Sequence, residues 1–331
     1  MLIDQRSQTG AFPAAILSCL GRDATPFAFL ASAKAEGIAG ALVSICGIDG
    51  GAPKPMGEHM AVLADGRHVG HVSGGCVEPA IAAEVVQLIA AGRDEIIRFG
   101  KGSCFIDIRF PCGGGVDLLV HAAPSARLLD EALQRFARRE AFAIGFDQAG
   151  SRSVILDHAD VATGWHDGVF HRRYLPRTRL LLAGRGPDFE VMARVAAAAE
   201  YDVALATPDE ASALALGTLG APITLLASPG QVWDLPIDRW TATVLLFHEH
   251  EWENAILARA AASNGFYIGA LGSQRTHVQR RERLAGMGVP AEQVERIRGP
   301  IGVIDRAREP GMLALSVLAE IAAARSALDQ V

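Results

Sequence analysis

The chain has 331 residues, half of them apolar, and 37 acidic against 31 basic side chains give it a net charge of −6. This length suits two domains of about 150 residues each, and the acidic balance argues against a general nucleic-acid-binding protein. Without an evident run of about 18 apolar residues or a signal-peptide pattern at the start, we expect no membrane span and a cytoplasmic location. The five cysteines, an odd number in a core-rich chain, indicate reduced thiols rather than a disulfide scaffold.

The first part of the chain, residues 1–124, predicts an α+β domain. Helical spacing up to Glu36 precedes a β-branched, apolar run that is typical of a buried strand. After a loop dense in Gly and Pro at 47–57, Asp65-Gly66 predicts the turn of a β-hairpin. The expected strands are 38–46, 60–63, 69–72, 95–99 and 116–120.

The segment Ser73-Gly74-Gly75-Cys76-Val77-Glu78 predicts a strand end, a glycine turn and the start of an amphipathic helix. Pro79 is tolerated only in a first helical turn, and Gly92 is placed to end the helix. Cys76 therefore lies at a helix N-terminus, a setting that lowers a thiol pKa and favours bound anions. Glu78 in the same turn would partly oppose the thiolate.

A second segment, Pro111-Cys112-Gly113-Gly114-Gly115, again joins Cys to Gly-Gly ahead of an expected strand. For either turn alone, a capping loop whose Cys is a small buried hydrophobe remains an alternative. Two such turns in one chain favour a functional role.

Residues 125–176 form a connecting segment or a small subdomain. An amphipathic helix is expected at 126–138 and a strand at 141–145, and Asp167-Gly168 is a second hairpin signal. The sequence leaves open whether this segment stands alone or extends a neighbouring domain.

From residue 177 to 331 the pattern becomes β-α-β, which predicts a Rossmann-like domain with a doubly wound parallel sheet. The run 180–183 is continuously apolar, as a central parallel strand requires. Pro310 opens a closing apolar helix. Further strands are expected at 203–206, 223–226, 243–247 and 267–269.

The dinucleotide fingerprint of this domain is incomplete. Gly184 and Gly186 supply the first two glycines of G-x-G-x-x-G, but Phe189 at the third is too large for the usual helix–strand packing. Asp188 adds negative charge beside the expected pyrophosphate, and Asp209 comes two residues late for a ribose contact. We therefore expect a Rossmann-type fold without ordinary NAD(H) binding.

Two further segments follow expected strands, where doubly wound sheets bind ligands. In His248-Glu249-His250-Glu251 the two histidines would project to one side if the strand continued, but a metal site needs a third ligand, and a polar loop is the commoner explanation. The turn that contains Gly272 and Ser273 precedes a helix whose arginines suit phosphate groups or solvent. These arginines are Arg275, Arg280, Arg281 and Arg283.

Taken in order, these pieces resemble the XdhC/CoxI family, the maturation chaperones of molybdenum hydroxylases such as xanthine dehydrogenase. The two Cys-Gly turns resemble the first and second motifs of the family, and the Rossmann-like turn, the strand end at His248, and residues 267–273 and 299–302 resemble its C-terminal part. Pro187 stands where the family usually has His, and Thr207-Pro208-Asp209 replaces Asp-Pro-Arg. Residues 303–306 also differ from the usual Leu-Asp-Ile-Gly, so all three departures lie in the C-terminal domain.

The resemblance implies a chaperone without classical turnover that binds the molybdenum cofactor transiently and protects it during sulfuration. The bound form would be molybdopterin, with its cytosine dinucleotide form left open. Delivery to an apo molybdenum hydroxylase is implied, as is a cysteine desulfurase that supplies the sulfur. The apolar closing helix would suit a homodimer.

The residues that match the family motifs are the candidate site. Cys76 and Cys112 are the candidates for cofactor or sulfur handling, and we expect them to lie close together along a cofactor cleft. The candidate cofactor-binding residues are Ser73, Gly74, Gly75, Cys76, Glu78, Cys112, Gly113, Gly114, Gly184, Gly186, His248, Gly272 and Ser273. The alternatives are an NAD(P)-dependent oxidoreductase that uses the Rossmann-like domain, and a purely docking protein.

Overall fold

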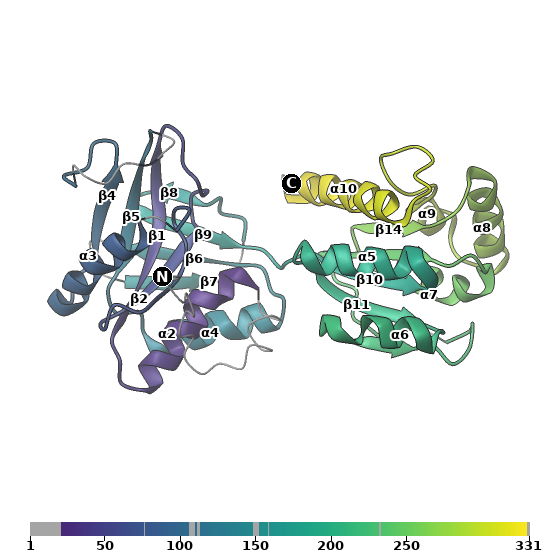
Figure 1. Cartoon of the computed structure of the whole chain (residues 1–331), viewed down its shortest axis with the longest axis horizontal. Helices are drawn as coiled ribbons and strands as arrows, with labels where there is room; N and C mark the ends of the chain where they lie inside the picture. The colour runs from purple at the N-terminus through teal and green to yellow at the C-terminus, as the bar shows by residue number, and fades with distance from the viewer. Residues whose placement is uncertain are drawn as a thin grey trace, which may run out of the picture. The chain divides into compact units, whose positions relative to one another are not determined.

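The computed structural model describes residues 21–75, 77–105, 110, 113–147, 152–157, 159–231 and 233–329. It divides into two units, Met1–Pro176 and Arg177–Val331 (Figure 1). The division falls where the β-α-β pattern begins in the sequence. The expectation about a signal peptide concerns residues outside the described ranges.

The first sheet of the N-terminal unit has five antiparallel strands in the order β3-β2-β1-β5-β4. Alternate residues of each strand face opposite sides, so Leu42 packs under helix α2 whereas Ala41 and Val43 pack under helix α3. The elements are α2 (Thr25–Ala35), β1 (Gly40–Asp49), β2 (His59–Leu63), β3 (His68–Gly70), α3 (Glu78–Ala91), β4 (Glu95–Gly100) and β5 (Gly115–His121). This arrangement confirms the expected α+β architecture.

Local signals fix several element ends. Gly66 has a φ of 86° in the turn between β2 and β3, which confirms the predicted hairpin. Pro79 lies in the first turn of α3, and Gly92 ends that helix in the left-handed conformation with a φ of 63°. The helix that follows the first cysteine turn therefore has the predicted bounds.

A second sheet in this unit has four antiparallel strands in the order β7-β6-β9-β8. Its aromatic side chains share a core with α2 and the first sheet: Tyr174 contacts Phe27 and forms a 2.5 Å hydrogen bond with His59. Burial lowers the pKa of His59 to about 3, so this link is neutral. The elements are α4 (Ala126–Ala137), β6 (Phe142–Asp147), β7 (Arg152–Leu156), β8 (Gly164–His166) and β9 (Val169–Tyr174). Residues 125–176 thus extend the N-terminal unit.

The C-terminal unit is a parallel six-stranded sheet in the order β12-β11-β10-β13-β14-β15. Counted from β10 this is 3-2-1-4-5-6, the strand order of the Rossmann fold, and it confirms the predicted doubly wound sheet. The strands are β10 (Arg179–Gly184), β11 (Asp202–Thr207), β12 (Ile223–Leu225), β13 (Thr241–Leu246), β14 (Tyr267–Ala270) and β15 (Ile297–Arg298).

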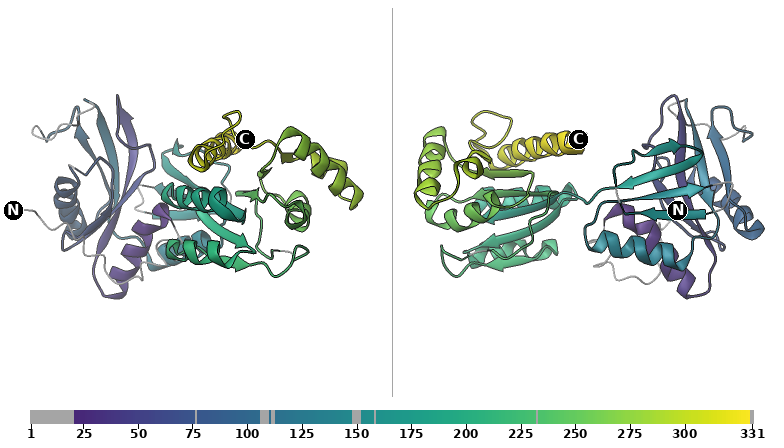
Figure 2. Two further views of the ribbon diagram at one scale, coloured as in Figure 1. Left: turned by 45° about the vertical axis from the view of Figure 1, so that its right-hand side comes forward. Right: turned by 180° about the vertical axis from the view of Figure 1, so that it is seen from behind.

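Helices cover both faces of the parallel sheet. One face packs against α5, α6 and α10, and the other against α7, α8 and α9; the yellow helix α10 lies beside α5 (Figure 2). The helices are α5 (Gly186–Ala198), α6 (Glu210–Leu216), α7 (Asn254–Ala261), α8 (Gln274–Gly286), α9 (Ala291–Glu295) and α10 (Pro310–Asp329), with a short 3-10 turn at His250–Trp252. The crevice at the switch point therefore lies between the ends of β10 and β13, whose following helices lie on opposite faces.

Helix α10 is long and apolar enough, by length and composition, to cross a membrane. It is the one such helix among the described residues, and the sequence-based expectation of no membrane span did not anticipate it. Its buried residues, including Leu313, Val317 and Ile321, pack in the core beneath the sheet. This core packing accounts for its apolar character.

Candidate functional site

The two cysteine turns leave the same end of the first sheet. Gly115 at the start of β5 pairs with Asp49 at the end of β1 and with Gly100 at the end of β4. Because β3 is antiparallel to β2 and β2 to β1, β3 also ends at Gly70 on this side. The loops that contain the two motifs therefore start from one edge of the sheet, although Cys76 and Cys112 themselves lie outside the described residues.

A buried carboxylate holds the first turn in shape. Glu78 is 2% exposed and accepts hydrogen bonds from the backbone N–H of Ser73 (2.8 Å) and from its hydroxyl (2.7 and 2.9 Å). Burial opposes ionisation, yet the donors on Ser73 and the nearby His71 hold the pKa of Glu78 below its usual range. Glu78 is thus engaged within the turn, rather than aimed at the neighbouring thiol as the sequence suggested.

The glycines of the first turn are open to an approaching ligand. Gly74 and Gly75 are exposed, and no atom lies within 4 Å of the place that a Cβ would take at either position. Gly75 has a φ of 98°, a conformation that side chains rarely adopt. A rigid anchor at Ser73 and Glu78 therefore supports an uncovered stretch of backbone.

Replacing Glu78 with Gln tests this anchor. A lowered pKa stabilises the fold above the unfolded value of about 4.3, and the stabilisation is lost as the pH falls through the folded pKa. We expect the substitution to cost about 1–3 kcal/mol at pH 7, because buried donors on Ser73 lose a charged acceptor. Thermal unfolding at pH 7 and pH 4 should show a wild-type advantage that shrinks in acid; an advantage that is the same at both values would contradict the assignment.

The second turn is packed at one glycine and open at the next. Gly113 is exposed, has a φ of 69°, and has no atom within 4 Å of a Cβ position. Gly114 is buried, and a Cβ there would overlap the carbonyl oxygen of Gly51 and approach that of Asp49 to 2.8 Å. The glycine- and proline-rich loop after β1 thus lies directly against the second motif.

Charged side chains surround this second turn. Arg98 donates to both carboxylate oxygens of Asp117 (2.7 and 2.8 Å), and the ammonium of Lys101 lies 3.5 Å from Asp49. The backbone N–H of Lys101 donates to the carbonyl of Gly114 (3.0 Å). Lys101 is therefore a solvent-exposed cation beside the motif, which the sequence analysis did not select although glycines flank it.

Two further cysteines are described in this unit. Cys46 in β1 is buried, and burial together with Asp117 raises the pKa of its thiol to about 12. Cys104 is exposed in the loop after β4, at the sheet end where the motif loops lie. Cys46 is consequently a protonated core residue at neutral pH, unlike the exposed thiol of Cys104.

In the C-terminal unit, the glycine turn after β10 is closed by the domain's own side chains. The N–H of Gly186 donates to the hydroxyl of Ser212 (3.2 Å), which in turn donates to Glu190 (3.1 Å). Asp209 accepts from the N–H groups of Ala211 and Ser212 and caps α6. The donor and the acid that a dinucleotide would use are thus both engaged.

The packing of this turn agrees with the incomplete fingerprint. Phe189 is fully buried in the core between α5 and the sheet, where the fingerprint has a glycine. Gly184 lets β10 approach β13, because a Cβ there would stand 2.8 Å from the carbonyl oxygen of Leu246. Gly186 has a φ of 75° and open space around its Cβ position.

The histidines after β13 do not form the arrangement that strand continuation would give. The strand ends at Leu246, so His248 is exposed in a loop and His250 begins a 3-10 turn, with Nδ1 3.5 Å from Glu253. Among the described residues, no group of three or more His, Cys, Asp or Glu side chains is arranged to hold a metal ion.

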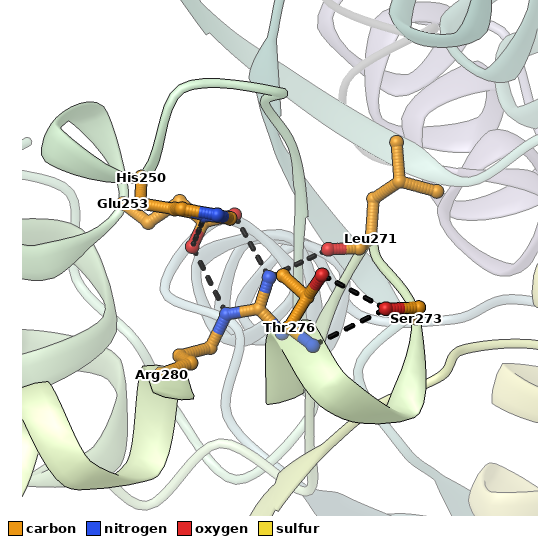
Figure 3. A network of polar contacts seen from close by, with 6 residues as sticks. All are labelled: His250, Glu253, Leu271, Ser273, Thr276 and Arg280. Carbon is orange, nitrogen blue, oxygen red and sulfur yellow. Dashed lines mark hydrogen bonds and ion pairs between the residues drawn. The ribbon is translucent and has the colours of Figure 1, made fainter. Parts of the chain in front are cut away.

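A buried ion pair lies beneath the turn that contains Gly272 and Ser273. Arg280 is fully buried and donates to both oxygens of Glu253 at 2.9 Å and to the carbonyl of Leu271 at 2.5 Å (Figure 3). Ser273 caps α8 by accepting from the N–H of Thr276 at 3.2 Å. The expectation that Arg280 belongs to an exposed basic face is therefore wrong, since its partner comes from the loop after β13.

Comparisons with known proteins agree with these architectures. The family model of the XdhC Rossmann domain matches residues 180–321, and the model of the XdhC and CoxI family matches residues 33–100. The chain is 38% identical to the molybdenum cofactor insertion chaperone PaoD of Escherichia coli (strain K12), over 90% of this chain and 87% of that protein. It is 25% identical to a probable xanthine dehydrogenase component of Bacillus subtilis (strain 168), over 85% and 91% of the two chains.

A solved structure shares the fold. The crystal structure of a protein described as a xanthine dehydrogenase, from Bacillus halodurans, aligns with a TM-score of 0.68 at 17% identity, covering 91% of this chain and 96% of that one. The two family matches and the extended similarity to PaoD lead to one conclusion. The chain belongs to the XdhC and CoxI family.

Proposed function

We propose that this chain is a molybdenum cofactor chaperone that binds the cofactor, protects it during sulfuration and delivers it to an apo molybdenum hydroxylase. One observation carries the proposal: the loops of both cysteine motifs leave the same end of one sheet, with exposed glycine backbone in each. The similarity to an insertion chaperone over most of both chains supports it.

The chemistry of this sheet end fits such a cargo. The cofactor carries a phosphate and a dithiolene, and exposed N–H groups at glycine turns and at a helix start suit anions. Lys101 adds a positive charge beside the second turn. Thiolates bind soft metals and sulfur species, so Cys76 and Cys112 are the residues that we assign to the sulfur-rich end of the cofactor.

The remaining parts of the proposal concern the C-terminal unit and the partners. The carboxyl ends of its strands, with Gly186, His248 and Ser273, would hold the pterin or the cytidine part of a dinucleotide form. A cysteine desulfurase would supply the sulfur, and a homodimer and a cytoplasmic location complete the proposal.

Counting bound molybdenum tests the proposal. Full-length wild type and the variants Cys76→Ala, Cys112→Ala and Cys46→Ala are mixed with molybdenum cofactor and separated by gel filtration. We expect a near-stoichiometric complex that either motif substitution weakens about tenfold or more, whereas Cys46→Ala retains it because that thiol is buried and protonated. Failure of wild type to retain molybdenum would overturn the proposal.

The same samples address the oxidoreductase alternative. Because Ser212 occupies the N–H of Gly186 and Asp209 caps α6, we expect no retention of NADH or NADPH. Stoichiometric nicotinamide nucleotide in place of molybdenum would favour that alternative. Cofactor binding that survives both motif substitutions would keep the chaperone and return the two cysteines to structural roles.

A further inference from the structure

An ion pair crosses the crevice at the switch point of the parallel sheet. Arg185, between Gly184 and Gly186, is extended (φ −154°, ψ 162°) and precedes α5. Its guanidinium pairs with the carboxylate of Glu249, which lies just after β13. Because β10 and β13 are neighbours whose helices lie on opposite faces, this pair spans the position where doubly wound sheets bind ligands.

The pair is accessible and only partly satisfied. The side chains of Arg185 and Glu249 are 42% and 41% exposed, so a ligand can reach both. One oxygen of Glu249 contacts Arg185, whereas the other is buried without a hydrogen-bond partner. A carboxylate with one unsatisfied buried oxygen gains hydrogen bonds by turning toward water.

The surroundings of Arg185 are acidic. Asp209 is close enough for Arg185 to contribute to the lowering of its pKa, and Asp188 lies in the first turn of α5. With Glu249 in place the guanidinium is neutralised, and the crevice disfavours an anion. Without Glu249, the guanidinium and the N-terminus of α5 face the open space at Gly186.

We propose that Glu249 is an internal competitor that occupies Arg185 until a phosphate or pyrophosphate ester displaces it. A phosphate oxygen pair matches the planar guanidinium better than a singly bonded carboxylate and carries more charge. Arg185 would thus hold the phosphate end of the ligand, and Glu249 would exclude weaker anions. This inference rests on the proposed function for the identity of its ligand, the molybdenum cofactor.

Opposite effects of the two partners distinguish this role from a structural ion pair. Equilibrium binding of molybdenum cofactor, inorganic phosphate and inorganic pyrophosphate is measured with full-length protein. We expect Glu249→Gln to tighten binding about fivefold, because the competing charge is gone, and Arg185→Met to weaken it about tenfold or more. In the double variant, Glu249→Gln should have no further effect.

Glu251→Gln is the matched control, since it removes an equal charge from an exposed residue two positions away. It should change affinity less than twofold, which separates loss of pairing from a general change in charge. Equal weakening by Glu249→Gln and Arg185→Met would overturn the inference and leave a structural bridge.

The outcomes separate this inference from the proposed function. Cofactor binding that none of these variants alters overturns the inference and leaves the chaperone. Phosphate or pyrophosphate binding with the predicted order of variants, but without cofactor binding, supports the inference and overturns the chaperone. Absence of binding to all three probes overturns both. Tighter binding of pyrophosphate than of phosphate would identify the dinucleotide form as the better ligand.

Discussion

Replacing Arg280 with Ala is expected to destabilise the C-terminal unit by about 3–5 kcal/mol, because it leaves the carboxylate of Glu253 buried without its cation. Both side chains are completely inaccessible to solvent. Arg280 also joins the loops after β13 and β14, since it donates to Glu253 and to Leu271. Urea unfolding followed by tryptophan fluorescence measures the change, since three of the four tryptophans lie in this unit.

Two further variants make this result specific to the buried charge. Arg281→Ala removes a neighbouring exposed cation, 3.9 Å from Glu295, and should cost less than about 1 kcal/mol. Replacing Arg280 and Glu253 together with Met and Gln should cost less than the sum of the two single changes, because neither charge is left alone. Equal costs for Arg280→Ala and Arg281→Ala would contradict the buried pair.

Replacing Gly114 with Ala is the second change expected to have a large effect. The new methyl group would overlap the carbonyl oxygen of Gly51, and backbone atoms cannot rotate away as a side chain can. We expect a loss of about 1–3 kcal/mol or more from this overpacking. Because the loop after β1 must shift, retention of molybdenum cofactor should fall as well, measured by gel filtration of folded protein at low temperature.

Gly113→Ala serves as the comparison one residue earlier. Its Cβ would meet open space, so the cost is the positive φ alone, about 1–2 kcal/mol. A smaller effect of Gly114→Ala than of Gly113→Ala on thermal unfolding would refute the packing of the two loops.

Local signals predicted much of this fold. The Asp65-Gly66 turn, Pro79 and Gly92 around α3, and the apolar run in β10 each act within a few residues. The strand order of the C-terminal unit followed from the alternation of strands and helices, since right-handed crossovers leave few arrangements. The expected elements therefore hold where short-range chemistry decides.

Long-range partners decided the remainder. Arg280 lies on the buried face of α8 with His277 and Leu284, but its partner Glu253 is 27 residues away and no local pattern names it. The placement of residues 125–176 depended similarly on distant contacts, such as Tyr174 with His59. The two-residue strand β15 is too short for a periodic signal.

The candidate site was predicted in part. The turn at Ser73 was recognised, but the hydrogen bonds that occupy Glu78 are visible only once the loop folds back. Lys101 was missed because a single exposed lysine carries no pattern, and its place beside Gly114 comes from strand pairing. The closeness of Cys76 and Cys112 stays a prediction.

Each sheet is built entirely within one of the two units. Every strand pair described joins β1–β9 among themselves or β10–β15 among themselves, with none across the boundary after Pro176. A genetic exchange at this boundary would therefore leave the backbone ladders of both halves complete. Evolution can consequently recombine the cysteine-bearing half and the Rossmann half as separate modules, altering one recognition task without rebuilding the other.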